Sequence, residues 1–332
     1  MILSKAPTRI DLSGGTLDIW PLYLFLEDAV TVNVGITLYA TARITNQPGS
    51  TITIISKDLG ATESADRLDS LTKEGKLSLI SRLIHHFAPA KGFRIETDCA
   101  APAGSGLGGS SALAIAVCGA LNEMTKAGYS NEDLIAVARD VEAQQLQIPT
   151  GEQDYYAAVF GGFQGWHFQV RNVTREPYPI SPQEIQERMI LFFSGQSRSS
   201  GINNWQVFRS YIDGDNGVRE TLLQIREEAR KVHNALLKKE WELAVKHIEF
   251  EWNARKKLAP GITTPQIEEI IRFGTENGAR MGRVCGAGGG GALVLLVPPE
   301  NRENLIQLAR QRKFHILDFE IATEGLQISI EK

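Results

Sequence analysis

Apolar and polar residues alternate, with many β-branched side chains, over four stretches of the first sixty residues. They are residues 3–12, 29–34, 37–45 and 51–56. Alternation with a period of two places one set of side chains on one face of an extended chain, so each stretch predicts a β-strand. Other apolar stretches predict strands at residues 93–100, 163–170, 189–193 and 292–297.

Longer segments carry apolar residues at helical spacing. Residues 130–133 read Ser-Asn-Glu-Asp, the Ser-x-x-Asp form of a capping box, which predicts that a helix begins there. Strands and helices cluster along the chain instead of alternating strictly, which favours an α+β fold. The predicted helices span residues 75–87, 110–126, 131–147, 218–239, 241–258 and 266–277, with a short helix through Tyr155 and Tyr156.

A boundary between two domains is predicted at residues 171–183. This segment holds three prolines and shows little periodicity. At 332 residues the chain is also longer than a typical single core. We therefore expect an N-terminal domain at residues 1–175 and a C-terminal domain at residues 183–332.

Composition narrows the classes of protein to consider. With 42% hydrophobic residues, 22% charged residues and a net charge of −4, the sequence is typical of a soluble globular protein and gives no basic field for nucleic acid. No apolar run has transmembrane length, and no signal-peptide pattern is present. The three cysteines cannot all pair and the six histidines show no zinc-ligand spacing. We expect a cytoplasmic protein with no membrane partner and no zinc site.

The segment with the most chemical information is residues 102–112, Pro-Ala-Gly-Ser-Gly-Leu-Gly-Gly-Ser-Ser-Ala. It joins a predicted strand to a predicted helix, and its four glycines allow tight bends that turn backbone N–H groups toward one point. A helix N-terminus adds unpaired donors and partial positive charge. The segment therefore predicts a phosphate site.

Three kinds of phosphate loop were compared with this segment. The P-loop of nucleotide hydrolases needs a lysine directly before the Ser/Thr, and Gly109 precedes Ser110 here. The dinucleotide pattern Gly-x-Gly-x-x-Gly is matched by residues 104–109, but no strand ending in an acidic residue follows at the required distance. The third kind is a glycine-serine loop, whose backbone holds phosphates while a serine hydroxyl reaches a metal.

In this third form the segment resembles the central motif of the GHMP kinases, a family that includes galactokinase, homoserine kinase and mevalonate kinase. Residues 6–18, APTRIDLSGGTLD, are similar to the first motif of that family, and residues 285–292, CGAGGGGA, to its third. Residues 151–158, 194–200 and 262–267 are most similar to the branch of heptose 7-phosphate kinases and fucokinases. The resemblance implies a ribosomal protein S5 domain 2-like N-terminal domain and a ferredoxin-like C-terminal domain.

The resemblance also implies two cofactors, ATP and Mg²⁺, and a set of catalytic and metal-binding residues. Asp154 would orient or deprotonate the acceptor hydroxyl, and Arg9 would be its partner and a stabiliser of phosphate charge. Ser110 and Glu142 would bind Mg²⁺. Helical spacing supports Glu142 independently, because it falls on the apolar face with Ile135 and Ala138, where a carboxylate needs a cation or a donor. The residues assigned to the ATP phosphates are Pro102, Gly104, Ser105, Gly106, Leu107, Gly108, Gly109, Ser110 and Ser111.

The same resemblance assigns the residues that would bind the acceptor sugar. Asp18 would accept hydrogen bonds from sugar hydroxyls, with Gly15 and Thr16 beside it. Ser197 and Arg198 match a substrate segment of the sugar kinase branch, although a surface salt bridge would explain Arg198 equally well. The branch usually has three glycines before Thr-Asp, whereas this chain reads Gly-Gly-Thr-Leu-Asp at residues 14–18.

The sequence thus predicts an ATP-dependent kinase that phosphorylates a hydroxyl of a sugar or sugar phosphate, a heptose 7-phosphate among the candidates. A mevalonate-type or other small-alcohol kinase is the alternative within the same family. Two alternatives belong to other functional classes: a non-catalytic nucleotide-binding regulator and a dinucleotide-dependent oxidoreductase. The expected partner is a small molecule, and the oligomeric state is left open.

Overall fold

The computed structural model describes residues 1–195 and 201–331. Eight strands of these residues form one sheet. Six of them follow the order β12-β1-β2-β5-β3-β4; β6 pairs with the part of β2 that β5 leaves free, and β7 pairs with β6. All neighbours are antiparallel except β3 and β5. The strands are β1 (Ile2–Ser13), β2 (Ala29–Asn46), β3 (Ile52–Ser56), β4 (Ala61–Ala65), β5 (Phe93–Cys99), β6 (Phe163–Phe168), β7 (Val173–Pro177) and β12 (Gln327–Ile330).

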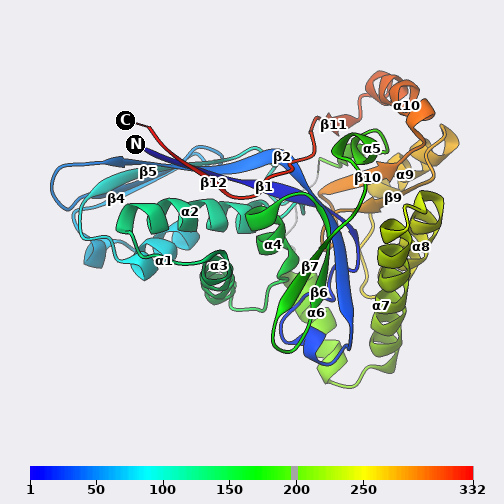
Figure 1. Cartoon of the computed structure of the whole chain (residues 1–332), viewed down its shortest axis with the longest axis horizontal. Helices are drawn as coiled ribbons and strands as arrows, with labels where there is room; N and C mark the ends of the chain where they lie inside the picture. The colour runs from blue at the N-terminus through cyan, green and yellow to red at the C-terminus, as the bar shows by residue number, and fades with distance from the viewer. Residues whose placement is uncertain (196–200, 332) are drawn as a thin grey trace.

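Four helices cover one face of this sheet, as Figure 1 shows. They are α1 (Ser78–Phe87), α2 (Gly109–Thr125), α3 (Asn131–Leu146) and α4 (Gln153–Phe160). Helix α2 lies against β1 and β2 and is buried on all sides from Ser111 to Leu121, which explains why its apolar residues show almost no helical period. In the described part of the chain, no helix has both the length and the apolar character needed to cross a membrane.

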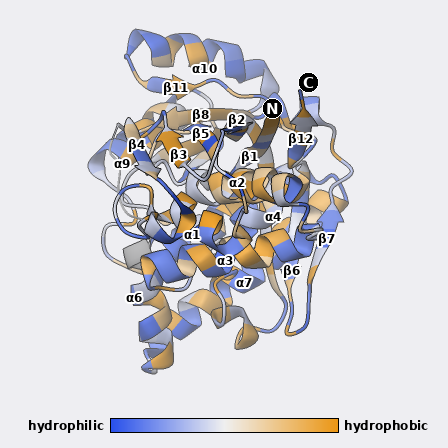
Figure 2. Ribbon diagram, turned by 90° about the vertical axis from the view of Figure 1, so that its left-hand side faces the viewer, coloured by the Kyte–Doolittle hydropathy of each residue, from blue (hydrophilic) through white to orange (hydrophobic). Residues whose placement is uncertain are grey.

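The second sheet has the strand order β11-β8-β10-β9 and is antiparallel throughout. This is the order of a ferredoxin-like domain, with helices inserted after its first and third strands. Figure 2 shows β8 in hydrophobic colours and the outer helix α10 as largely hydrophilic. The elements are β8 (Met189–Phe193), β9 (Met281–Val284), β10 (Ala292–Leu296), β11 (His315–Leu317), α5 (Pro182–Gln186), α6 (Gly201–Ile212), α7 (Asn216–Leu237), α8 (Trp241–Arg255), α9 (Pro265–Glu276) and α10 (Pro299–Gln311).

The α+β class predicted from the sequence is confirmed, but one predicted pair of strands is wrong. Residues 29–34 and 37–45 form a single strand, β2, which is strongly bent in Figure 1. The first half of β2 pairs with β6 and the second half with β5, while β1 runs along both and takes up the bend in register shifts. Tertiary pairing therefore overrides the local break in the pattern.

Two further strands lie where the sequence shows little pattern. Strand β7 occupies Val173–Pro177 within the expected boundary segment, paired with β6. Strand β12, near the end of the chain, pairs with β1, so both termini lie side by side in Figure 1. The last residues thus join the sheet of the first residues, and the division at residues 1–175 and 183–332 stays a prediction.

Four buried charged side chains connect the two sheets: Asp11 on β1, Glu251 and Arg255 on α8, and Arg283 on β9. Arg283 Nη1 lies 2.7 Å from Glu251 Oε2, and its Nη2 lies 3.4 Å from Asp11 Oδ2. Arg255 Nη1 lies 3.4 Å from the same Asp11 oxygen and 3.7 Å from Glu251 Oε1. Since no side chain of the four is more than 4% exposed, each charge depends on its partners for stability.

Replacing Arg283 by methionine should destabilise the fold by about 3–5 kcal/mol, because Asp11 and Glu251 would stay buried with one cation fewer. Arg280→Met is the matched control, since the Arg280–Glu242 pair is 52% and 66% exposed and should contribute at most about 1 kcal/mol. Urea unfolding of both variants measures the difference. Equal losses would show that the buried cluster carries no special weight.

Candidate active site

A cavity of about 410 Å³ lies beside the glycine loop and gathers most of the residues predicted from the sequence. Leu107 and Gly15 lie behind its wall, each presenting its backbone carbonyl to an arginine. Ser197 and Arg198 fall outside the described residues. The predicted residues that line the cavity are Arg9, Thr16, Asp18, Pro102, Gly104, Ser105, Gly106, Gly108, Gly109, Ser110, Ser111, Glu142 and Asp154.

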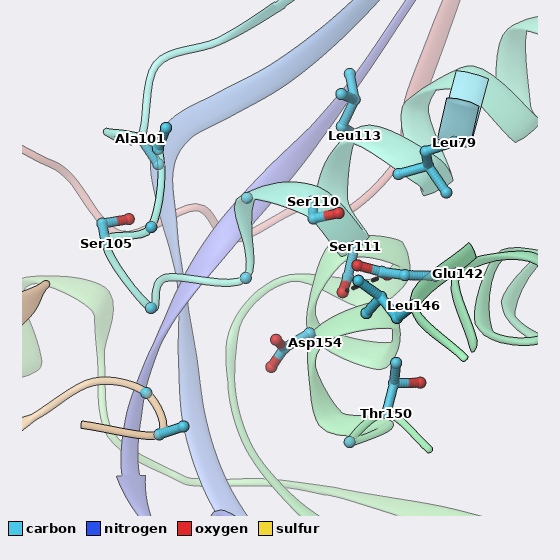
Figure 3. Close-up of a pocket in the computed structure, with 18 of the residues that line it drawn as sticks. Leu79, Ala101, Ser105, Ser110, Ser111, Leu113, Glu142, Leu146, Thr150 and Asp154 are labelled. Atoms are coloured by element: carbon cyan, nitrogen blue, oxygen red, sulfur yellow. Dashed lines mark hydrogen bonds between the residues drawn. The ribbon is translucent and has the colours of Figure 1, made fainter. Parts of the chain in front are cut away.

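The glycine loop leads from β5 into the first turn of α2, as Figure 3 shows. Gly104, Gly106 and Gly108 have positive φ angles of 69°, 74° and 73°, a conformation that few other residues adopt at low cost. Gly108 is the N-cap of α2, and no side chain caps the helix. The N–H groups of its first turn are therefore left for a ligand, and the helix dipole favours an anion there.

The glycine loop is held in place by backbone contacts from both halves of the chain. The N–H of Arg9 donates to the carbonyl of Leu107 at 3.0 Å, and the N–H of Ala292 donates to the carbonyl of Ser105 at 2.6 Å. A Cβ added at Gly286 would lie 2.7 Å from the Cα of Gly106. The third glycine motif thus packs directly on the glycine loop, and only glycine permits this approach.

Arg9 and Asp154 form an ion pair in which two guanidinium nitrogens contact one carboxylate oxygen. The Nε and Nη2 of Arg9 both lie 2.7 Å from Asp154 Oδ1. The Nη1 of Arg9 donates to the carbonyls of Gly106, at 2.6 Å, and Cys285, at 2.8 Å. Burial alone would lower the Arg9 pKa, but Asp154 and Asp11 outweigh it and raise that pKa, so the guanidinium stays charged.

Asp154, at the start of α4, is the more exposed member of this pair, although both residues line the cavity. Its side chain is 21% exposed, against 6% for that of Arg9. Burial raises its pKa above the usual range, although the neighbouring Arg9 guanidinium acts to lower it. A raised pKa makes this carboxylate a better proton acceptor than one free in water.

Glu142 lies opposite the N-terminus of α2, with its carboxylate directed at the two serines there (Figure 3). Its Oε2 accepts hydrogen bonds from the hydroxyls of Ser111, at 3.1 Å, and Tyr155, at 2.6 Å. Burial raises the Glu142 pKa, and hydrogen bonds from Ser110, Tyr155 and Ser111 act against this. Within residues 1–195 and 201–331 no lysine, arginine or histidine forms an ion pair with Glu142.

Asp18 is buried and lines the cavity. Its Oδ2 accepts the N–H of Gln153 at 3.0 Å, which attaches the first motif to the start of α4. Burial raises the Asp18 pKa to about 7, with Asp154 and Asp11 adding to the effect and the Gln153 N–H opposing it. Asp18, Asp154 and Asp11 thus place three carboxylates at one end of the cavity.

Comparison with known proteins identifies the family. The model of the GHMP kinases N terminal domain matches residues 76–162, and that of the GHMP kinases C terminal domain matches residues 232–316. Together the two matches cover just over half of the chain. The chain belongs to the GHMP kinase family. It is therefore an ATP-dependent kinase that acts on a hydroxyl group, and the oxidoreductase alternative is wrong.

Relatives of known activity extend over nearly the whole chain. A D-glycero-alpha-D-manno-heptose 7-phosphate kinase of Campylobacter jejuni is 28% identical, covering 98% of each chain. A mevalonate kinase of Thermococcus onnurineus is 23% identical over 91% of each. The crystal structure of a D-glycero-D-manno-heptose 1-phosphate kinase from Bacteroides thetaiotaomicron superposes with a TM-score of 0.79, 25% identity and full coverage of both chains.

Sequence reasoning missed two charged residues of this GHMP kinase site, Asp11 and Arg255. Both line the cavity. Arg255 Nη1 donates to the carbonyl of Gly15 at 2.8 Å, and Nη2 to that of Gly286 at 3.3 Å, so it supports the first and third glycine motifs. Asp11 lies within the first motif, residues 6–18, but was given no role of its own there. For Arg255 the signal was the spacing of Glu251 and Arg255, four residues apart on one helix, which is also common on exposed helix faces.

An apolar wall was missed as well. It comes chiefly from α1, from the start of α2 and from the end of α3 and its following loop. These segments are far apart in the sequence, and each has the composition of an ordinary core. The apolar residues that line this side of the cavity are Leu59, Leu77, Leu79, Ile80, Leu113, Leu146, Ile148 and Pro149.

Asp18→Asn should stabilise the kinase more at pH 8 than at pH 5. The folded chain holds a proton on Asp18 up to a pKa of about 7, whereas the unfolded chain loses it near 3.8. Ionising the buried carboxyl therefore costs stability progressively as the pH rises between these values. The gain from Asn should be on the order of 3 kcal/mol larger at pH 8. Calorimetry at both pH values tests this, with the exposed Asp140→Asn as control; a gain that does not grow with pH would contradict it.

Proposed function

We propose that this kinase transfers the γ-phosphoryl group of ATP to a hydroxyl of a sugar or sugar phosphate. The observation that carries the proposal is the Arg9–Asp154 pair, which lies between the phosphate loop and Asp18. The heptose phosphate kinases among the relatives support a sugar as acceptor. A heptose 7-phosphate is accordingly the first acceptor to test.

The phosphates of ATP are proposed to lie on the glycine loop and the N-terminus of α2. Gly104, Gly106 and Gly108 turn the backbone so that its N–H groups are available to phosphate oxygens. Pro102, Ser105, Gly109 and Ser110 line the same part of the cavity. The apolar wall beside it, with Leu79 and Leu113, suits a planar base that needs burial more than hydrogen bonds (Figure 3).

Mg²⁺ fits the group around Glu142. This carboxylate is 5% exposed and has no cation partner among the described residues, while serine hydroxyls face it. Mg²⁺ prefers hard oxygen ligands, and it needs only a few from the protein when ATP supplies further oxygens. We assign Glu142 and Ser110 as protein ligands, with Ser111 as a hydrogen-bond donor to Glu142. The ion would neutralise charge on the phosphates during transfer.

Asp154 is proposed to accept the proton of the attacking hydroxyl. Arg9 fixes the carboxylate through two contacts to one oxygen, Oδ1, which leaves Oδ2 for the acceptor. The same guanidinium lies beside the glycine loop and can stabilise charge that develops on the transferred group. Because an arginine is not deprotonated near neutral pH, Arg9 has an electrostatic role and Asp154 the role of base.

The acceptor is proposed to lie against Asp18 and Thr16. Asp18 accepts hydrogen bonds from sugar hydroxyls. Asp11 adds a second hydrogen-bond acceptor, because its buried Oδ1 has no hydrogen-bond partner among the described residues. Gly15 and Thr16 shape the wall, and Arg198 with Ser197 would contact a phosphate already on the sugar. We place the reaction in the cytoplasm, where ATP is available and free cysteines stay reduced.

The experiment that tests the proposal is ADP release from Mg-ATP over a panel of hexoses, heptoses, heptose 7-phosphates and mevalonate. We expect turnover with a sugar or sugar phosphate and little with mevalonate. Turnover on mevalonate alone would keep the kinase chemistry and overturn the sugar assignment. ATP binding without turnover on any acceptor would favour the non-catalytic regulator.

With the acceptor in hand, Asp154→Asn should lower kcat by about 10²–10⁴-fold, the usual contribution of a general base, while ATP binding changes little. Asp140→Asn is the control, because Asp140 is 59% exposed on α3 and should leave kcat unchanged. Steady-state kinetics and nucleotide titration measure both. An Asp154→Asn enzyme with normal kcat would remove Asp154 from the mechanism.

A further inference from the structure

Two histidines and a glutamate form a cluster outside the candidate active site, where the β6–β7 hairpin meets α7. His167 is on β6, Glu176 on β7 and His233 on α7. One imidazole nitrogen from each histidine and one carboxylate oxygen all lie within 4.8 Å of one another. None of the three residues lines the cavity described above. Figure 1 shows the hairpin and α7 next to each other at the end of the molecule away from the termini.

The distances within this cluster fit the spacing of ligands around one metal ion. The Nε2 atoms of His167 and His233 lie 3.4 Å and 3.2 Å from Glu176 Oε2. Ligands at about 2.0–2.1 Å from a tetrahedral zinc ion are separated by about 3.3 Å. By contrast, Nδ1 of His247 lies 2.7 Å from Glu228 Oε2, the length of a charge-assisted hydrogen bond.

The surroundings hold the histidine rings in position. The Nδ1 of His233 is 2.9 Å from the hydroxyl of Tyr178, and a proton on Nδ1 would leave the lone pair of Nε2 for a cation. Gly165 makes room for this contact, because a Cβ there would lie 2.7 Å from the Tyr178 hydroxyl and 2.8 Å from Nδ1. The Nε2 of His167 is buried and has no hydrogen-bond partner among the described residues.

We propose that His167, Glu176 and His233 bind a divalent transition-metal ion, with Zn²⁺ as the best match. Two imidazoles and one carboxylate are a donor set that zinc uses, whereas Mg²⁺ and Ca²⁺ prefer oxygen ligands alone. Glu176 is 45% exposed, so the ion has access from solvent and a water molecule completes the fourth position. The ion links strands β6 and β7 of the eight-stranded sheet to helix α7.

The proposal departs from the sequence-based expectation of no zinc site, which rested on the lack of short zinc-motif spacing among the histidines and cysteines. His167 and Glu176 come together through the pairing of β6 with β7, and His233 arrives from α7 more than fifty residues later. The competing explanation is that two protonated histidines pair with Glu176 and no metal is involved. The two explanations differ in how the protein responds to zinc in solution.

The test uses full-length, tag-free protein, treated with EDTA and then freed of chelator, without ATP or acceptor. Zn²⁺ is titrated against it in competition with a chromophoric chelator. We expect one ion per chain and a higher Tm in its presence. Glu176→Gln and His167→Gln, both at partly exposed positions, should weaken binding by about 100-fold or more and abolish the rise in Tm. Co²⁺ in place of zinc should give the visible spectrum of a tetrahedral site in the wild-type chain alone.

His247→Gln and Glu228→Gln are the matched controls, because they remove a histidine–carboxylate pair of hydrogen-bond length on neighbouring helices. Both should bind zinc with wild-type affinity. Absence of zinc binding in the wild-type chain would overturn the proposal, and so would undiminished binding by Glu176→Gln and His167→Gln. Because no nucleotide or acceptor is used, failure here would leave the proposed kinase reaction untouched.

Discussion

The guanidinium of Arg9 is the group on which the geometry of the active site depends. From strand β1 it contacts Asp154 of α4, the carbonyl of Gly106 in the glycine loop and the carbonyl of Cys285, the first residue of the third glycine motif. Four segments from both halves of the chain therefore share one buried cation. Removing it would leave a carboxylate and two carbonyls without their donor, a cost that such a buried site does not tolerate well.

Around this cation the backbone approaches more closely than side chains would permit. Gly286 lies against Gly106, and Gly108 lies against Asp154, where an added Cβ would be 3.1 Å from the carboxyl group. The buried cluster that contains Asp11 and Arg255 continues the same contact region toward α8, since Arg255 binds the carbonyls of Gly15 and Gly286. Glycines allow the backbones to approach closely, and arginines bind the carbonyls that converge there. The resulting cavity has walls from both halves of the chain.

Sequence reasoning predicted those parts of the site that lie within short motifs. The phosphate loop, Asp18 and the pairing of Arg9 with Asp154 follow from motif and resemblance, and the position of Glu142 on the inner face of α3 followed from helical spacing alone. Arg255 and the apolar wall could not be predicted in this way, because their role arises only when segments distant in the chain are brought together. Asp11 lies within the first motif, but its contacts with Arg255 and Arg283 also arise only in the folded chain. The same holds for β12, which is recognisable as a strand only beside β1.

The ends of helices and strands follow the same rule. Those set by local signals could be predicted, and those set by long-range pairing could not. Helix α3 begins after Ser130, as its capping box predicts, because the signal and the structure are both local. Strand β2 continues through Gly35 because β1 supports it on one side, which no local pattern reveals. Local signals thus place the glycine loop, whereas the part of the cavity around Asp11 and Arg255 depends on long-range pairing.

The most direct test of this account is a double-mutant cycle between Arg9 and Asp154. The kcat of Arg9→Met, Asp154→Asn and the double variant would be compared with that of the wild-type enzyme, with ATP binding as a check on the fold. If Arg9 acts through Asp154, the double variant should be about as slow as the slower single variant, so the two losses do not add. Losses that add in full would contradict the account, because each residue would then act independently of the other.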